Sequence, residues 1–236
     1  QHLFILFVFH CTIDFSIDTR KNKKDLLFRI FYVEDIEDSS AKLVSLVDSL
    51  LSIAQIEQGS VDYRFVAHNF MDIVEGAFVE LLPFAESKQV ELNLDVEISH
   101  IPVILDAEKI RHVVFNFIEN AIKYAPLGQV HIKVEPFEAS LVFNVTDNGC
   151  GFEPVQQFLL FEKFYRTETA KQTDNKGTGL GLYIAKNFIE GHKGEIWAKS
   201  DGGGQGSCFG FSIPFGIQVE HHLYSNTACK LFIGKL

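Results

Sequence analysis

Between residues 90 and 145 the spacing of apolar side chains changes from period two to helical spacing and back, and this change constrains the fold most. The pattern predicts strands at 90–96, 101–105, 129–134 and 140–145, with a helix at 107–124 between the two pairs. The last two strands are joined by a short turn, so they should pair with each other. Helices that alternate with partly antiparallel strands predict an α/β fold, a two-layer sandwich in which a mixed β-sheet packs on helices.

The flanking residues extend this pattern in both directions. Further helices are predicted at 34–58, 70–88 and 180–191, and further strands at 195–199 and 207–213. Gly59 stands where a left-handed residue would end the first of these helices. Pro83 lies inside the second, so that helix is expected to kink or divide. Residues 167–176 carry no large apolar side chain, which predicts a mobile loop.

Composition excludes several classes of protein. Of the 236 residues, 47% are hydrophobic and 22% are charged, which is typical of a globular chain and not of a disordered or fibrous one. The formal net charge of −10 argues against a general nucleic-acid or anionic-lipid binder. An anionic ligand would therefore need a local binding device.

The cysteines and the apolar runs bear on the cellular location of the chain. Cys11, Cys150, Cys208 and Cys229 are widely spaced and form no Cys-x-x-Cys, so neither a disulfide framework nor a zinc site is predicted. The apolar run at 3–9 is far shorter than the roughly 20 residues that cross a bilayer, and it lacks a signal-peptide pattern. We expect no membrane segment in this chain and a cytoplasmic location, although a parent protein could be membrane-anchored.

Asn116 and Asn120 are one helical turn apart in the predicted helix 107–124, so both amides project from one face. Lys123 follows three residues later. Two neutral oxygen donors beside a cation can hold a magnesium ion and nearby phosphates, since Mg²⁺ keeps several waters and takes few protein ligands. By itself, an Asn pair on a helix is more often solvated surface.

The sequence Asp147-Asn148-Gly149-Cys150-Gly151 directly follows a predicted strand. Glycines let the chain turn sharply and let a flat ligand approach the backbone. A carboxylate at the end of the strand can accept a hydrogen bond from the exocyclic amine of adenine. An ordinary Asp-Asn-Gly turn would have the same composition, so this segment alone is weak evidence.

A glycine-rich segment, Gly177-Thr178-Gly179-Leu180-Gly181-Leu182, opens the predicted helix 180–191. Its main-chain amides and the positive end of the helix dipole can bind an anion, which is the local device that an acidic chain needs. The spacing excludes a P-loop, and the polar residues before it exclude a dinucleotide-binding fingerprint. Just upstream, residues 161–166 include two phenylalanines and Arg166, directly before the polar loop. This pattern fits the anchor of a lid that closes over a ligand, and it also fits an ordinary helix end with a surface arginine.

In this order the four segments resemble the N box, first glycine box, F box and second glycine box of the ATP-binding domain of sensor histidine kinases. The resemblance continues through 191–197 and 204–214 and covers roughly two-thirds of the chain. Related ATPases occur in gyrase and heat-shock chaperones. The resemblance implies their α/β sandwich, with the nucleotide between helices and lid, and with ATP and Mg²⁺ as ligands.

The resemblance also implies roles for individual residues. Asn120 would be the magnesium ligand, Asn116 and Lys123 would lie near the phosphates, and Tyr124 would lie beside the nucleotide. Asp147, with Gly149 and Gly151, would recognise adenine. Arg166 would contact the terminal phosphates, which would be cradled by Gly177, Thr178, Gly179, Leu180, Gly181 and Leu182. His192 matches a structural position, and no catalytic residue is identified.

The domain organisation follows from the same comparison. Residues 1–33 are unassigned, 34–60 resemble the second helix of the dimerisation and phosphoacceptor hairpin, 61–215 form the ATP-binding domain, and 216–236 are an unassigned tail. The apolar stripe of the 34–58 helix would face a partner helix or, more commonly, a core. The family's acceptor motif, close to His-Glu-Leu-Arg-Thr-Pro, is not found, because neither His2 nor His10 is followed by the acid and the proline.

The function implied is an ATP-binding kinase domain of two-component signalling that transfers the γ-phosphate to a histidine. The implied partners are the receiver domain of a response regulator and, if the hairpin is complete, a second copy of the chain. Two alternatives stay open: a non-catalytic dimerisation and nucleotide-sensing module, and a related protein serine kinase, for which the 34–58 helix has no evident role.

Overall fold

The computed structural model describes residues 36, 40, 43, 44, 46–95, 98–174 and 177–216. The chain divides into two compact units, residues 1–48 and 49–236. The described residues of the first unit are helical, and the helix continues in the second unit as far as residue 57. The strands that the structure describes belong to the second unit.

Five strands form the main sheet, in the order β2-β4-β5-β7-β6. They are β2 (Glu91–Asp95), β4 (Gln129–Phe137), β5 (Ser140–Asp147), β7 (Ser207–Pro214) and β6 (Glu195–Lys199). β2 is parallel to β4, and the other three pairs are antiparallel. The predicted mixed sheet and the antiparallel pair after the helix 107–124 are therefore confirmed. A separate two-stranded sheet joins β1 (Val66–Asn69) to β3 (Pro102–Leu105).

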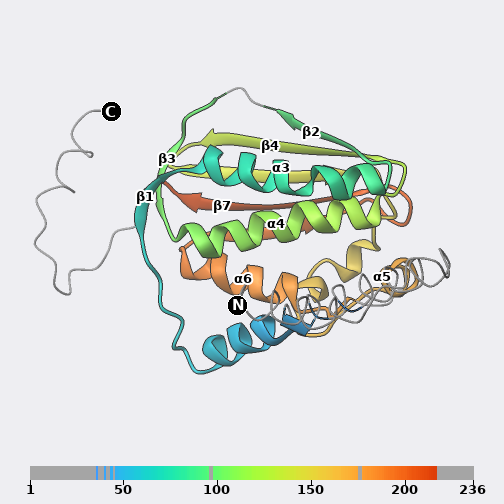
Figure 1. Ribbon diagram of the computed structural model, residues 1–236, viewed down its shortest axis with the longest axis horizontal. Coiled ribbons are helices and arrows are strands. Elements are labelled where there is room, and N and C mark those ends of the chain that lie inside the picture. Colours follow the sequence, from blue (N-terminus) through green and yellow to red (C-terminus); the bar gives the residue numbers. More distant parts are fainter. Residues whose placement is uncertain are drawn as a thin grey trace, which may run out of the picture. The chain divides into compact units, whose positions relative to one another are not determined.

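Three helices lie side by side on one face of the main sheet: α3 (Phe70–Ser87), α4 (Ala107–Tyr124) and α6 (Gly181–Gly191), as Figure 1 shows. Burial alternates along β4, where Val130, Ile132 and Val134 are buried and their neighbours are more exposed. One face of each strand therefore packs on the helices, as a period of two requires. The core between the two layers is aromatic, with Phe70, Phe117, Phe143 and Phe211 fully buried.

Side-chain caps fix where two of these helices begin. The side chain of Asn69 accepts a hydrogen bond from Met71 N in the first turn of α3 and another, of 2.9 Å, from Ile101 N. Asp106 Oδ1 accepts a hydrogen bond of 3.1 Å from Lys109 N in the first turn of α4. These caps satisfy main-chain amides that have no partner within the helix.

Two local expectations are wrong in part, the division of the helix at Pro83 and the loop at 167–176. α3 continues through Pro83 without dividing, because Pro83 is exposed and the carbonyl that loses its helical partner lies on the solvent side, at the exposed Val79. The polar segment 167–176 is not simply a loop, since it contains the helix α5 (Glu168–Thr173). Thr167 caps this helix by accepting a 3.1 Å hydrogen bond from Ala170 N.

The helix that ends at residue 57 stops as predicted, with Gly59 at a φ of 62°. Most of its apolar stripe is exposed: Leu43, Val47, Leu50, Leu51 and Ala54 are exposed, and Leu46 is half-buried. The described residues therefore do not show the commoner of the two alternatives, a stripe that packs into a core. Among the helices that the structure describes, none has the length and apolar character needed to cross a bilayer.

Candidate nucleotide-binding site

Asn116 and Asn120 lie on the same face of α4, where the sequence places them. Asn120 Nδ2 donates a hydrogen bond of 3.0 Å to Asn116 Oδ1, and both side chains are partly buried. This bond orients the Asn120 amide so that its oxygen remains available as a ligand for a cation. Lys123 lies one turn further on, but its amine forms an ion pair of 3.0 Å with Glu119.

The glycine-rich segment meets α4 at Asn116. A Cβ atom added to Gly181 would lie 2.2 Å from Asn116 Nδ2, so a larger residue there would require the Asn116 side chain to move. This contact places the N-terminus of α6 beside the Asn116–Asn120 pair, although the two segments are far apart in the sequence.

The start of α6 has no side-chain cap and no acidic residue in its first turn. Its leading amides are therefore not satisfied by a side-chain cap, and the positive end of its dipole is not neutralised locally. Upstream, Gly179 has a φ of 71° and Phe164 N donates a 3.0 Å hydrogen bond to its carbonyl, which ties the glycine-rich segment to residues 161–166. Thr178 Oγ1 accepts a hydrogen bond from Leu180 N, and Leu180 is buried, whereas Leu182 is half-buried.

The loop 147–151 packs on the C-terminal end of α4. Cys150 N donates a 2.9 Å hydrogen bond to Tyr124 O. A Cβ atom on Gly149 would lie 2.1 Å from the same oxygen, so this loop can rest on the helix only without a side chain there. Gly151 lies against the turn formed by residues 200–206. α4 thus connects the loop, through Tyr124, to the start of α6, through Asn116.

Asp147 is buried at the end of β5, and each of its carboxylate oxygens has a protein partner. Oδ1 accepts a 2.8 Å hydrogen bond from Gly149 N, and Oδ2 accepts a 2.5 Å hydrogen bond from Ser207 Oγ. Burial raises the pKa of Asp147 above its ordinary value, while the hydrogen bonds from Ser207 and Gly149 act in the opposite direction. The main-chain amide of Ser207 also acts on the carboxylate. A carboxylate has about four acceptor positions, so these donors do not use all of them.

Arg166 is bound to the main chain of its own segment. Its guanidinium donates to the carbonyl oxygens of Gly177 at 2.9 Å and Ala170 at 2.7 Å, and also to that of Asp174. These bonds close residues 166–177 into a loop around α5. A contact between Arg166 and a phosphate would require the guanidinium to give up part of this arrangement.

A cleft of about 250 Å³ opens beside this loop. It is lined by Gln156, Phe164, Tyr165, Arg166, Thr167, Glu168 and Lys171. Arg166 is the one predicted site residue in this lining. The segments 116–124, 147–151 and 177–182 are brought together by direct contacts along α4, and they do not line this cleft.

Two residues that shape the site were not among those predicted from the sequence. Ser207 donates a hydrogen bond to the Asp147 carboxylate. Its position directly after Gly206, at the start of a predicted strand, is the feature of the sequence that could have pointed to it. Asn148 Oδ1 accepts a 2.7 Å hydrogen bond from Gln129 N, which fixes the loop to the start of β4. Its place in an Asp-Asn-Gly turn suggests a turn residue but not this particular partner.

Comparison with known proteins gives a family for this site. Residues 105–217 match the model of the family described as "Histidine kinase-, DNA gyrase B-, and HSP90-like ATPase". The Bacillus subtilis sensor histidine kinase WalK is 31% identical over 202 residues, which cover 84% of this chain and 32% of WalK. The circadian input-output histidine kinase CikA of Synechococcus elongatus is 30% identical over 80% of this chain and 25% of CikA. The chain thus spans about a third or less of the length of these relatives.

Solved structures share the fold. The full-length structure of ShkA in complex with AMPPNP has a TM-score of 0.69 at 23% identity, covering 85% of this chain and 41% of ShkA. The catalytic domain of the histidine kinase ThkA has a TM-score of 0.58 at 24% identity, covering 64% of this chain and 96% of that domain. Residues 105–217 of the chain are therefore a member domain of the histidine kinase-, DNA gyrase B- and HSP90-like ATPase family.

Proposed function

We propose that this chain binds ATP with Mg²⁺ and is the kinase domain of a two-component sensor, donating the γ-phosphate of ATP to a histidine. The observation that carries the proposal is the contact of Gly181 with Asn116, which brings an uncapped helix N-terminus beside two amide side chains in an acidic protein. Membership of the ATPase family and the sensor kinase relatives support it.

The residues fit the two ligands. The main-chain amides of the first turn of α6, which has no side-chain cap, and the segment 177–182 suit the phosphates, and the buried Asp147 suits the adenine amine. Asn120 would hold Mg²⁺, with Asn116, Lys123 and Tyr124 around it, and Mg²⁺ would supply positive charge that neutralises the phosphates. Among the described residues no cluster of His, Cys, Asp and Glu offers another metal site.

In the transfer step, the bond between the γ-phosphorus and the β-phosphate oxygen breaks and a bond from phosphorus to an imidazole nitrogen forms. ADP leaves, and the imidazole proton passes to a base or to water. This chain contributes binding and orientation, which carry most of the catalysis in phosphoryl transfer. The acceptor histidine is not assigned within residues 1–236, and His2 and His10 lie outside the described residues.

A histidine kinase of this kind would pass its phosphoryl group to the receiver domain of a response regulator in the cytoplasm. The structure of ThkA with the response regulator TrrA supports such a partner by similarity of fold. The exposed stripe with Leu43, Val47 and Leu50 supports a homodimer through a paired helix.

The lack of a recognised acceptor motif favours a second candidate, a nucleotide-sensing module without transfer. Incubation with ATP labelled at the γ-phosphate, with and without an intact histidine acceptor domain from a sensor kinase, separates the two. Acid-labile label on either protein supports the kinase. Saturable binding without transfer supports the sensing module, and acid-stable label would indicate a serine kinase.

A further inference from the structure

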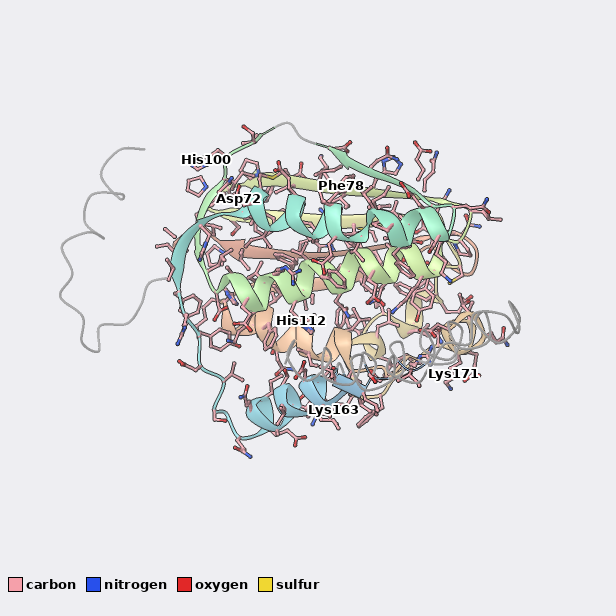
Figure 2. The ribbon with its side chains drawn as sticks, in the orientation of Figure 1. Asp72, Phe78, His100, His112, Lys163 and Lys171 are labelled. Atoms are coloured by element: carbon pink, nitrogen blue, oxygen red, sulfur yellow. The ribbon has the colours of Figure 1, made fainter. Side chains whose placement is uncertain are left out.

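The end of the first described helix and the segment that follows it are attached to α6 at two places. Glu57 forms an ion pair with Lys163, and the Lys163 amine lies 4.9 Å from the centre of the Tyr183 ring in the first turn of α6. Lys163 is labelled in Figure 2. At the other end of α6, Tyr63 donates a 3.2 Å hydrogen bond from its hydroxyl to Asn187 O. We call residues 57–65 the strap.

The strap meets a buried histidine at the end of α6. His192 is fully buried; its Nδ1 donates to Phe188 O at 2.7 Å, and its Nε2 accepts a hydrogen bond of 3.0 Å from Asp106 N. Because Nε2 faces an N–H donor, it must carry a lone pair, so the imidazole is neutral with its proton on Nδ1. His192 therefore links the last turn of α6 to the residue that caps α4.

Asp106 joins the strap to the same point. Its Oδ2 accepts hydrogen bonds from Arg64 N at 2.9 Å and from Lys109 Nζ at 3.1 Å, while Oδ1 caps α4. The carboxylate is buried, so these three donors are its compensation for lost hydration. One buried pair, Asp106 and His192, thus holds the strap, the start of α4 and the end of α6.

Aromatic rings fill the space around this pair. The rings of Tyr63 and Phe65 stack at 5.6 Å, and each meets the His192 ring edge-on, at 5.5 Å and 5.2 Å. A Cβ atom on Gly191 would lie 2.0 Å from the Tyr63 hydroxyl, so the end of α6 accommodates this ring closely. The strap is packed against α6 and is not a loose connection.

α4 and α6 pack against each other along their length, for example through the rings of His112 and Phe188, and two of their contacts lie at opposite ends of α6. One is the Asp106–His192 hydrogen bond, and the other is the contact of Gly181 with Asn116 in the candidate site. The 11 residues of α6 between these points span about 16 Å. Because a helix moves as a rigid rod over this length, a shift at its His192 end also shifts Gly181 relative to Asn116.

We propose that Tyr63, Arg64 and His192 are positioning residues for nucleotide binding: the strap holds α6 against α4, and releasing it displaces the glycine-rich segment and weakens Mg-ATP binding. This inference rests on the proposed function for its ligand. Attachment of the strap would thus regulate the affinity of the nucleotide site from the far end of α6.

The neutral state of His192 gives the strap a pH dependence. Burial lowers the pKa of His192, and Lys109 acts in the same direction, whereas the Phe188 carbonyl and Asp106 oppose the change. Around it, Lys109 belongs to α4, Asp106 is the residue that caps α4, and Tyr63 belongs to the strap, while Glu190 of α6 acts on Tyr63. A group whose pKa is lowered in the attached state contributes stability above its free value, about 6.5, and this stability is lost as pH falls through the lowered value.

The first test compares Mg-ATP affinity and hydrogen exchange of residues 62–66 in the whole chain and in three variants. Tyr63→Ala removes the ring, and we expect roughly three- to tenfold weaker binding together with faster exchange at Arg64. Tyr63→Phe loses only the bond to Asn187 O and should lie between Tyr63→Ala and the wild type. Phe137→Ala, which truncates an exposed ring at the tip of the β4–β5 hairpin, is the matched control and should bind normally.

His192→Gln supplies the second test, because a glutamine oxygen can accept the Asp106 N–H but does not titrate. We expect the ratio of wild-type to variant affinity to be constant above pH 7 and to fall towards pH 5.5. A residue that only fills space would give a flat ratio. If Tyr63→Ala does not fold, Tyr63→Phe and His192→Gln decide.

Unchanged affinity in Tyr63→Ala, or a flat pH ratio for His192→Gln, overturns this inference while leaving nucleotide binding in place. Failure of the wild-type chain to bind Mg-ATP overturns the proposed function itself. The two failures are therefore distinguishable in one set of titrations.

Discussion

Ser207 Oγ donates a 2.5 Å hydrogen bond to Asp147 Oδ2, joining the first residue of β7 to the last residue of β5 across 60 positions of sequence. The two residues are also paired in the antiparallel register of these strands. The hydroxyl fixes the direction of the one buried carboxylate in the loop 147–151. The proposed recognition of adenine by Asp147 would therefore depend on a residue in another part of the chain.

Ser207→Ala should weaken Mg-ATP binding by roughly tenfold, because the Asp147 carboxylate loses a charge-assisted hydrogen bond and is free to turn. Calorimetric titration of the variant measures the change. Ser212→Ala, which truncates a half-buried serine on the same strand, is the control. Equal affinity in the two variants would exclude an orienting role for Ser207.

Asp147→Asn should relax the preference for adenine over guanine nucleotides, because an amide presents a donor where the carboxylate only accepts. The same variant should be more stable to unfolding at neutral pH. Burial raises the pKa of Asp147, so the native state binds more protons than the unfolded state and stability falls as pH rises through that pKa. Competition between ATP and GTP and thermal melting at several pH values measure the two effects, and a fully retained adenine preference would contradict the assigned role.

Asn120→Ala should abolish most of the enhancement that Mg²⁺ gives to ATP binding, because the amide oxygen is the proposed metal ligand. Affinities are measured with Mg²⁺ and with EDTA, and the ratio of the two is compared. Asn93→Ala, on the edge strand β2, provides the matched control. A ratio in Asn120→Ala equal to that of the wild type would remove Asn120 from the metal site.

Gly181→Ala should reduce affinity by about tenfold or more, since its Cβ would lie 2.2 Å from Asn116 Nδ2 and must displace that side chain. Gly76→Ala is the control, because a Cβ there meets nothing within 4 Å on α3. That substitution should stabilise the fold by about 0.5–1 kcal/mol without changing affinity. Thermal melting and titration of both variants provide the comparison.

Much of the fold could be predicted because it is encoded locally. The helix α4 begins and ends at the predicted residues, 107 and 124, since Asp106 caps it and Pro126 follows it. β6 also has its predicted bounds. No strand was predicted at 66–69, because the status of β1 as a strand depends on pairing with β3, which no local pattern encodes. The boundaries of the predicted domains stay a prediction.

The site could be predicted in its parts but not in its connections. Spacing alone places Asn116 and Asn120 on one face of a helix, and the structure confirms that placement. The partners of Lys123 and Arg166, which are Glu119 and three carbonyl oxygens, depend on side-chain conformations that the sequence does not specify. The link between Asp147 and Ser207 depends on strand register, and the roles of all these residues toward ATP stay predictions.

Calorimetric titration of the wild-type chain with ATP in the presence of Mg²⁺ tests whether this chain binds Mg-ATP. We expect saturable binding with one site per chain, weakened when Mg²⁺ is removed and weaker for GTP than for ATP. The absence of saturable binding at millimolar nucleotide would contradict this expectation.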